Sequence, residues 1–340
     1  MKTRFALIGS EGHYQYYEPS LHELAELELV AVAPADERDP MGGLLSAPGV
    51  DGSTHQFRSY EQLLDAEKPD VVQVCAPLSR LPAIVGACVE RRIAVISEKP
   101  LAMDLATLSA LYRKAKSNAV PIAALYGYRR FKSFEAVRDA VAAGEIGQVI
   151  GGESSLSYRW GKNRPDSFRS RSTFPGIVAF IGVHIVDWLL WICGDLFVEA
   201  SGSETCTAHP DYPACASLAS FMLGMKQGGT IVATVDYLRP ASAATHGDAR
   251  LRIFGTLGVA EANDIEDSAS LVSDPAGQRT LSLPSTASWY TQFIRSIRNE
   301  GASFITTARA FRVSEIALKI QQAIDERRTC SLAPTEFLDG

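Results

Sequence analysis

The sequence predicts an α/β protein of two domains, a doubly wound parallel Rossmann sheet followed by an α+β domain with a large, mainly antiparallel open sheet. The chain has 340 residues, which exceeds what one hydrophobic core usually supports. Up to residue 125, apolar strand-like runs alternate with helical patterns, as in βαβ units. From residue 126 to residue 340, strand-like runs follow one another with few helices between them, which favours an antiparallel sheet.

The first domain, residues 1–125, is predicted from the order of its apolar segments. The predicted strands are 4–8, 28–33, 70–75, 93–97 and 120–125, and the predicted helices are 59–67, 81–91 and a segment after the N-cap residue Asp104. Short connections between these elements predict a parallel sheet with right-handed crossovers. Ligands of such sheets bind beyond the carboxyl ends of the strands.

The turn after the first strand is the first candidate for cofactor binding. A glycine fingerprint lets backbone amides approach a pyrophosphate at a helix N-terminus. Here Gly9 stands at the first position, the second glycine is displaced by one residue to Gly12, and Glu11 introduces a carboxylate. Gly9, Ser10, Gly12 and His13 are therefore the predicted cofactor contacts, and the alternative is a simple tight turn.

The residues after the second strand bear on the type of cofactor. Asp36 follows this strand and can accept hydrogen bonds from a ribose diol, as NAD requires. Arg38 lies close by in the sequence and can instead meet a 2′-phosphate, so NAD is favoured over NADP only slightly. The alternative is a solvated polar turn.

The run 93–101, IAVISEKPL, ends a buried strand in an acid, a base and a proline. Lys99 would lie at the carboxyl edge of the sheet, and the Lys99–Pro100 bond is a candidate for the cis form. The alternative is that Glu98 and Lys99 are ordinary loop charges. A helix after Asp104 is predicted by its N-cap and its apolar periodicity.

The second domain begins with an amphipathic helix over 131–143, and strands follow. The predicted strands are 148–158, 216–223, 230–237, 250–254 and 259–262, with a last helix over 310–324 and a short strand near 330–332. Segment 176–194 is almost entirely apolar but contains His184 and Asp187, so a buried helix is favoured over a membrane span. The two side chains share one face, where the carboxylate can orient the imidazole; the alternative is a structural pair.

Charge and composition exclude several classes of partner. The net charge of −6 argues against nucleic acid or an anionic membrane. The six cysteines and six histidines show no metal-ligand spacing, so no metal is expected. The N-terminus lacks the pattern of a signal peptide, and we expect a cytoplasmic protein.

A group of basic residues precedes the apolar segment. The group contains Arg159, Lys162, Arg164, Arg169 and Arg171, and Arg129 and Arg130 lie further upstream. Arginines in such a group can clamp a carboxylate or phosphate of a substrate. For most of them the alternative is solvated loop charge.

Three motifs carry a resemblance to a known family, namely Glu98-Lys99-Pro100, the segment 144–147 (GEIG) and the segment 182–187 (GVHIVD). The chain resembles the Gfo/Idh/MocA oxidoreductase family over essentially its whole length. The resemblance implies a two-domain enzyme that uses NAD or NADP to oxidise or reduce a carbon of a sugar, cyclitol or related polyol. It implies Lys99 as the catalytic lysine and His184 as the imidazole in proton transfer or substrate binding, with Asp187 beside it. Ala76, Pro77 and Glu98 are further predicted cofactor contacts, and a homodimer or homotetramer through the second-domain sheet is expected.

The chain departs from the family pattern at three places. The aspartate four residues before the histidine is Phe180 here, the P-N-x-x-H segment is 77–81 (PLSRL), and the glycine turn is altered. These departures motivate an alternative, a catalytically inactive or regulatory nucleotide-binding homologue. A second alternative is hydrolysis or elimination on a glycoside with tightly held NAD.

Overall fold

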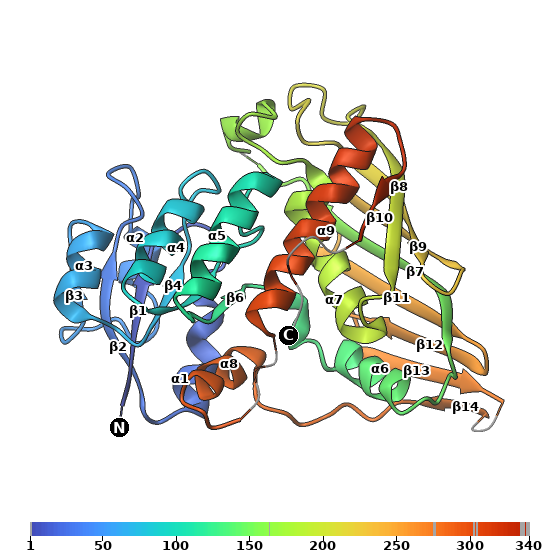
Figure 1. The fold of residues 1–340 in the computed structure, drawn as a ribbon, viewed down its shortest axis with the longest axis horizontal. Coiled ribbons are helices and arrows are strands. Elements are labelled where there is room, and N and C mark those ends of the chain that lie inside the picture. The colour runs from blue at the N-terminus through green and yellow to red at the C-terminus, as the bar shows by residue number, and fades with distance from the viewer. Residues whose placement is uncertain are drawn as a thin grey trace. The chain divides into compact units, whose positions relative to one another are not determined.

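The structure, a computed structural model, describes residues 2–162, 164–274, 277–301, 303, 305–333 and 337. The chain forms two compact units. The first comprises Met1–Gly127 and Thr286–Ser314, and the second comprises Tyr128–Ser285 and Glu315–Thr335. Figure 1 shows the order of their elements along the chain.

The first unit contains a six-stranded parallel sheet. Its strands, in spatial order, are β3 (His55–Gln56), β2 (Leu27–Ala33), β1 (Thr3–Ile8), β4 (Val71–Val74), β5 (Ala94–Ser97) and β6 (Ile122–Ala124). Most residues of the central strands are buried, as their unbroken apolar runs predict. The strand order reverses direction at β1 and β4, which is the switch point where ligands of such sheets bind.

Helices cover both faces of this sheet, because right-handed crossovers on either side of β1 place them on opposite faces. The helices are α1 (Glu18–Glu23), α2 (Gly42–Leu45), α3 (Tyr60–Glu67), α4 (Leu81–Glu90) and α5 (Leu105–Ser117). Helices α3, α4 and α5 lie side by side (Figure 1). Asp104 caps α5 by accepting a hydrogen bond from the amide of Thr107 at 2.8 Å, which confirms the predicted start of that helix.

Residues 286–314 return to the first unit, which local sequence patterns did not predict. Helix α8 (Trp289–Ile297) packs against α1, and the hydroxyl of Tyr290 donates to Oε1 of Gln73 on β4 at 2.7 Å. The first part of α9 (Thr307–Asp325) also belongs here, since Tyr126 donates to the carbonyl of Ala310 at 3.0 Å. The predicted division into 1–125 and 126–340 therefore differs from the compact units.

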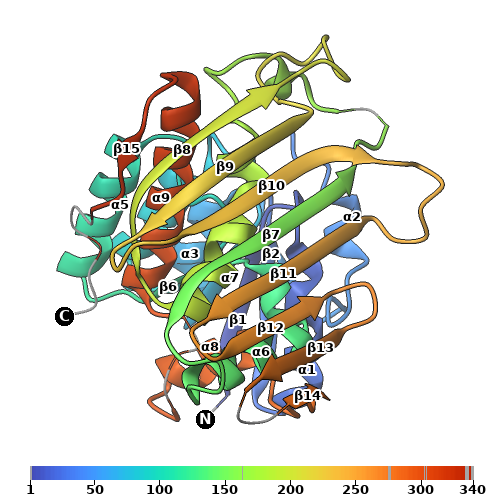
Figure 2. The same ribbon diagram turned by 90° about the vertical axis from the view of Figure 1, so that its right-hand side faces the viewer.

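The second unit is built on a nine-stranded sheet (Figure 2). The strands, in spatial order, are β14 (Gly277–Thr280), β13 (Ser268–Ser273), β12 (Gly258–Asn263), β11 (Gly247–Gly255), β7 (Val149–Arg159), β10 (Thr230–Arg239), β9 (Leu218–Met225), β8 (Phe197–Thr205) and β15 (Cys330–Ser331). All neighbours are antiparallel except β7 and β10. The central strands were predicted from the sequence, whereas β8, β13 and β14 were not.

Helices cover one face of this sheet. Helix α6 (Lys132–Ala142) packs on β12 and β13, and α7 (Val183–Cys193) packs on β7 and on α6. A π-helical turn, Val178–Gly182, leads directly into α7. The segment predicted to be a buried helix is thus helical and almost completely buried, and Trp188 fixes it to the sheet by donating to the hydroxyl of Ser154 at 2.9 Å.

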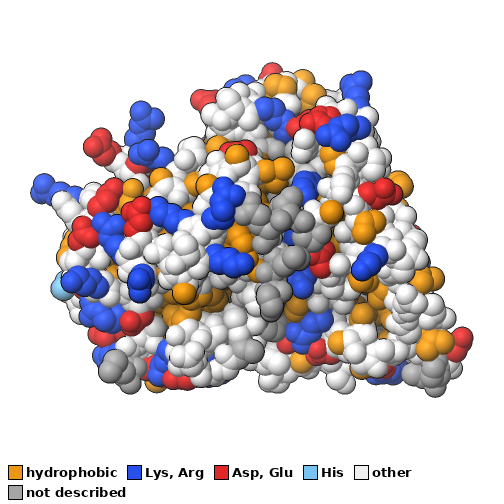
Figure 3. Space-filling view, in the orientation of Figure 1, with side chains coloured by type: hydrophobic (Ala, Val, Ile, Leu, Met, Phe, Trp, Pro, Cys, Tyr) orange, Lys and Arg blue, Asp and Glu red, His pale blue; other side chains and the backbone are white. Residues whose placement is uncertain are grey.

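The opposite face of the sheet carries exposed apolar side chains. They are Ile150 on β7, Met222 on β9, Val232 and Leu238 on β10 and Val272 on β13, each between 46% and 49% exposed. The expectation that this face pairs copies of the chain stays a prediction. Elsewhere, charged side chains of both signs are interspersed on the surface (Figure 3). Within the described ranges, no helix combines the length and the apolar character that crossing a membrane requires.

Candidate active site

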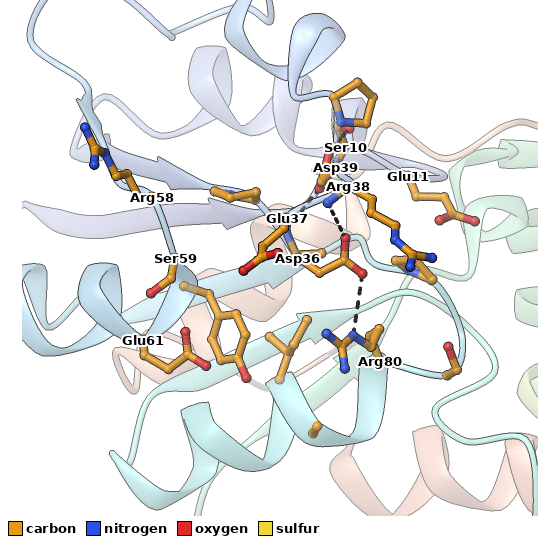
Figure 4. A pocket seen from close by; sticks show the side chains of 18 residues that line it. Ser10, Glu11, Asp36, Glu37, Arg38, Asp39, Arg58, Ser59, Glu61 and Arg80 are labelled. Carbon is orange, nitrogen blue, oxygen red and sulfur yellow. Dashed lines mark hydrogen bonds and ion pairs between the residues drawn. The ribbon is translucent and has the colours of Figure 1, made fainter.

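A cleft of about 1160 Å³ opens at the carboxyl edge of the parallel sheet in the first unit. Its walls come from the loops after β1, β2 and β4 and from the start of α3 (Figure 4). These loops meet because β2, β1 and β4 are neighbours in the sheet. Among the predicted cofactor contacts, Ser10, Asp36 and Pro77 line this cleft, and Ala76 is buried beside it.

The two glycines of the turn after β1 are required by close contacts. Gly9 has φ of 86°, and a Cβ there would lie 2.2 Å from the carbonyl oxygen of Cys75. Gly12 has φ of 73°, and a Cβ there would lie 2.2 Å from Oε1 of Glu98. Both positions therefore exclude a side chain. The displaced second glycine has a steric role, since it makes room for the Glu98 carboxylate.

Two carboxylates hold this turn in place. Glu98 accepts hydrogen bonds from the backbone amide of His13 at 2.6 Å and pairs with its Nδ1 at 2.7 Å. Asp39 accepts from the amides of Ser10, Ala35 and Met41, each at 3.1 Å, and from the hydroxyl of Ser10. Sequence reasoning missed Asp39, because no periodicity separates it from the other acids after β2.

Asp36 lies in the cleft, as predicted for an acid that receives a ribose. Its Oδ1 accepts from the amide of Arg38 at 2.8 Å, and its Oδ2 lies 3.5 Å from Nε of Arg80. Figure 4 shows Asp36 and Arg80 turned toward each other, with Arg58 lying apart from them. Arg80, which comes from the loop after β4, was not predicted as a site residue.

Glu98 and Lys99 follow directly on β5 and are 6% and 4% exposed. The Lys99–Pro100 bond is cis. Burial lowers the pKa of Lys99, and the neighbouring Glu98 charge opposes this only in part. Burial also acts to raise the pKa of Glu98, but His13 and Lys99 outweigh it, so that pKa is lowered. The sheet edge thus presents a buried amine whose proton is held more weakly than that of an ordinary lysine.

Glu11 lies in the same turn, and three other carboxylates act on it. Burial raises its pKa, and repulsion from Glu98, Asp39 and Asp36 raises it further. A pyrophosphate at this turn would add to that repulsion.

Replacing Glu11 with glutamine is expected to tighten NAD binding at neutral pH. Two unit charges 4 Å apart in water repel by about 1 kcal/mol, which corresponds to roughly fivefold in affinity. Because Glu11 is protonated below its raised pKa, wild type and Glu11→Gln should converge in acid and diverge as pH rises. Calorimetric titration with NAD across this range checks the prediction, with Glu61→Gln as a control in the same cleft; parallel curves would contradict it.

The second unit contains the other predicted catalytic residues. His184 and Asp187 lie on α7 and are 2% and 0% exposed. Both oxygens of Asp187 accept from Arg129, with Nη2 to Oδ1 at 2.6 Å and Nε to Oδ2 at 2.9 Å. Arg129, which was predicted only as one of several possible clamps, is therefore the main counter-ion of Asp187. Orientation of the His184 imidazole by this carboxylate stays a prediction.

One aromatic ring contacts the His184 imidazole, and further rings cluster around the helical turn before it. The ring of Tyr128 meets that of His184 edge to face with centroids 5.3 Å apart. Phe180, on the π-helical turn before His184, packs against Phe168 at 5.3 Å and Phe174 at 5.0 Å. Phe180, one of the departures from the family pattern, is thus part of an aromatic cluster.

The structure brings the predicted residues together in two groups. Gly9, Ser10, Gly12, His13 and Glu98 form one connected group in the first unit, beside Asp36 and Lys99, and His184 and Asp187 belong to the second unit. Within the described ranges, no three His, Cys, Asp or Glu side chains are grouped to hold a metal ion.

A parallel sheet with a glycine turn at its switch point, followed by a unit with a large open sheet, is the arrangement of a two-domain dinucleotide-binding protein with a Rossmann fold. Residues 3–126 match the family described as an oxidoreductase family with an NAD-binding Rossmann fold, and residues 134–261 match the GFO/IDH/MocA C-terminal domain. The chain belongs to the Gfo/Idh/MocA oxidoreductase family.

Relatives and solved structures agree with this assignment. The chain is 23% identical over 231 residues to myo-inositol 2-dehydrogenase of Thermotoga maritima and 24% identical over 235 residues to D-apiose dehydrogenase of Paraburkholderia graminis. These alignments cover 67% and 68% of the chain, and 66% and 60% of the relatives. A levoglucosan dehydrogenase in complex with NADH has the same fold, with a TM-score of 0.83 over 98% of this chain and 100% of that one, at 14% identity.

Proposed function

We propose that the protein transfers hydride between a nicotinamide cofactor and a secondary alcohol or ketone carbon of a sugar, cyclitol or related polyol. The observation that carries this proposal is Lys99, a buried amine with a lowered pKa at the sheet edge that also forms the cleft. A hydroxyl must lose its proton as hydride leaves the carbon, and an amine of lowered pKa is suited to receive it.

The residues of the cleft fit a dinucleotide. Gly9 and Gly12 keep the turn free of side chains where a pyrophosphate would approach, and Asp36 can accept hydrogen bonds from the adenosine ribose. We propose NAD rather than NADP, because the Asp36 carboxylate would repel a 2′-phosphate. Arg80 holds that carboxylate in the cleft and partly offsets its charge.

The second unit would contribute His184 to the same reaction. A buried imidazole can accept or relay the proton of the reacting hydroxyl. The position occupied by an aspartate in the family pattern is Phe180, which packs among other rings, so this position supplies no carboxylate to the proton transfer.

Fluorescence titration with NADH and NADPH, followed by a panel of sugars and cyclitols with NAD, tests the proposal. We expect the protein to bind NADH more tightly than NADPH. Losing hydrogen bonds to a charged group costs about 1.5–3 kcal/mol, so Asp36→Ala should weaken NADH binding by about 10- to 100-fold. Glu37→Ala, which removes the neighbouring exposed carboxylate, is the control and should have little effect.

Two results would contradict the proposal. A wild-type preference for NADPH would remove the role given to Asp36. Cofactor binding without turnover of any compound in the panel would favour the inactive homologue instead, for which Phe180 is the motivating residue.

A further inference from the structure

Arg164 lies within an aromatic cluster on the helix-covered face of the second-unit sheet. Its guanidinium stands 4.4 Å from the ring centre of Tyr237 and 4.9 Å from that of Trp160. Trp160 in turn stacks on His209, with centroids 3.9 Å apart and planes 11° from parallel. Tyr237 is buried on β10, so the arginine is held against the inner surface of the sheet.

The charge of Arg164 has no counter-ion among the described residues. Its Nη2 donates to the carbonyl of Arg159 at 3.1 Å, whereas its Nε is buried and makes no hydrogen bond. In the same basic group, Arg169 pairs with Asp166 and Arg171 pairs with Glu204 and Asp325. Lys162 is exposed. A partly buried cation that lacks an acid is costly unless an anion joins it.

Aromatic side chains connect Arg164 with His184 within this unit. The ring centres of Tyr237 and Tyr158 lie 6.3 Å apart. Gly247 lies against both Tyr158 and Tyr128, because a Cβ at this glycine would be 2.9 Å from the Tyr158 ring and 3.0 Å from the Tyr128 hydroxyl. Tyr128 contacts His184, as described above. These rings form an aromatic wall that leads from the guanidinium toward the imidazole.

A second row of rings leads from Arg164 to the turn before His184. Arg164 lies 5.7 Å from the ring centre of Phe168, and Phe168 contacts Phe180, one helical turn before His184. Phe180 stands where the family pattern has an aspartate. The replacement removes a negative charge that would repel an anionic ligand from this wall.

We propose that the substrate is a sugar acid or a related polyhydroxy carboxylic acid, whose carboxylate is bound by Arg164 while its reacting hydroxyl lies at His184. A guanidinium fork matches the two oxygens of a carboxylate. This inference rests on the proposed function, and it narrows the substrate from polyols in general to those that carry a carboxylate.

Matched ligands that differ only in the acid group provide the test. The probes are D-gluconate with D-glucitol and D-glucuronate with D-glucose, titrated calorimetrically into the NADH-loaded full-length protein and assayed for turnover with the appropriate form of the cofactor. We expect the acids to bind at least about tenfold more tightly, as one charge-assisted hydrogen bond allows.

Arg164→Met, which keeps an extended apolar side chain, should weaken binding of the acids by about 10- to 100-fold and that of the neutral partners by less than about threefold. NADH affinity should be unchanged. Lys162→Met removes the same charge from an exposed position of the same loop and should change neither ligand. A folded Arg164→Lys variant should keep part of the preference for acids.

Equal binding of acids and neutral partners to the wild-type protein would overturn the inference, as would equal weakening of both by Arg164→Met. Tighter binding of D-glucose 6-phosphate than of D-glucuronate would overturn it in favour of a phosphate. Oxidation of neutral sugars without any acid preference would leave the proposed function intact. Acid binding that depends on Arg164 but gives no hydride transfer would contradict the proposed function and, with it, the assignment of the acid as a substrate, whereas the carboxylate site at Arg164 would stand.

Discussion

Lys99→Ala is expected to lower kcat by about 10²- to 10⁴-fold, the usual contribution of a positioned acid or base. The physical reason is that Lys99 is 4% exposed and burial lowers its pKa, so the neutral form that accepts a proton is present at lower pH than in ordinary lysines. The affinity for NAD should change little. Steady-state kinetics with the best compound of the panel, beside a cofactor titration, measure both quantities.

Two variants serve as controls for this prediction. Lys99→Arg keeps the positive charge but cannot supply a neutral base, so its turnover should be as low as that of Lys99→Ala. Lys114→Ala removes a lysine from an exposed pair with Glu90 and should leave turnover unchanged. A rate for Lys99→Ala equal to that of wild type would refute the catalytic assignment.

Arg129→Ala is expected to destabilise the second unit by about 3–5 kcal/mol, the usual cost of removing one partner from a buried ion pair. Arg129 and Asp187 are each 1% exposed at their side chains, and the guanidinium contacts both carboxylate oxygens. The substitution would leave the Asp187 charge buried on α7, one turn from His184. Denaturant unfolding followed by tryptophan fluorescence measures the free energy lost.

The double variant Arg129→Met with Asp187→Leu separates the cost of an orphaned charge from the value of the pair. Apolar residues of similar size often replace a buried ion pair at little cost. The double variant should therefore be more stable than Arg129→Ala alone. If both have equal stability, the loss comes from packing against Trp191, whose ring centre lies 5.0 Å from the Arg129 guanidinium.

Much of the fold follows from local patterns in the chain. Unbroken apolar runs such as 93–97 end at the edge of the sheet, so the position of Lys99 could be predicted from residues beside it. The helix after Asp104 and the buried segment around His184 were likewise predicted from a cap and from periodicity. Strands with weak alternation, such as β13 and β14, and helix α8 were missed.

The partners of the site residues depended on residues far apart in the sequence. Gly12 makes room for Glu98, which lies 86 positions away, and Asp187 pairs with Arg129, which lies 58 positions away. Asp39, not only Asp36, fixes the turn after β1.

The sequence by itself determined the central strands of both sheets, most of the long helices and the family, because alternation, caps and short motifs act between neighbours along the chain. Only the tertiary structure decided which charges have partners. It paired Arg169 and Arg171 with acids and left Arg164 among aromatic rings without a described counter-ion. The physical reason is that ion pairing depends on distances of a few ångströms, and the packing of distant strands sets these distances while the spacing of residues in the sequence does not.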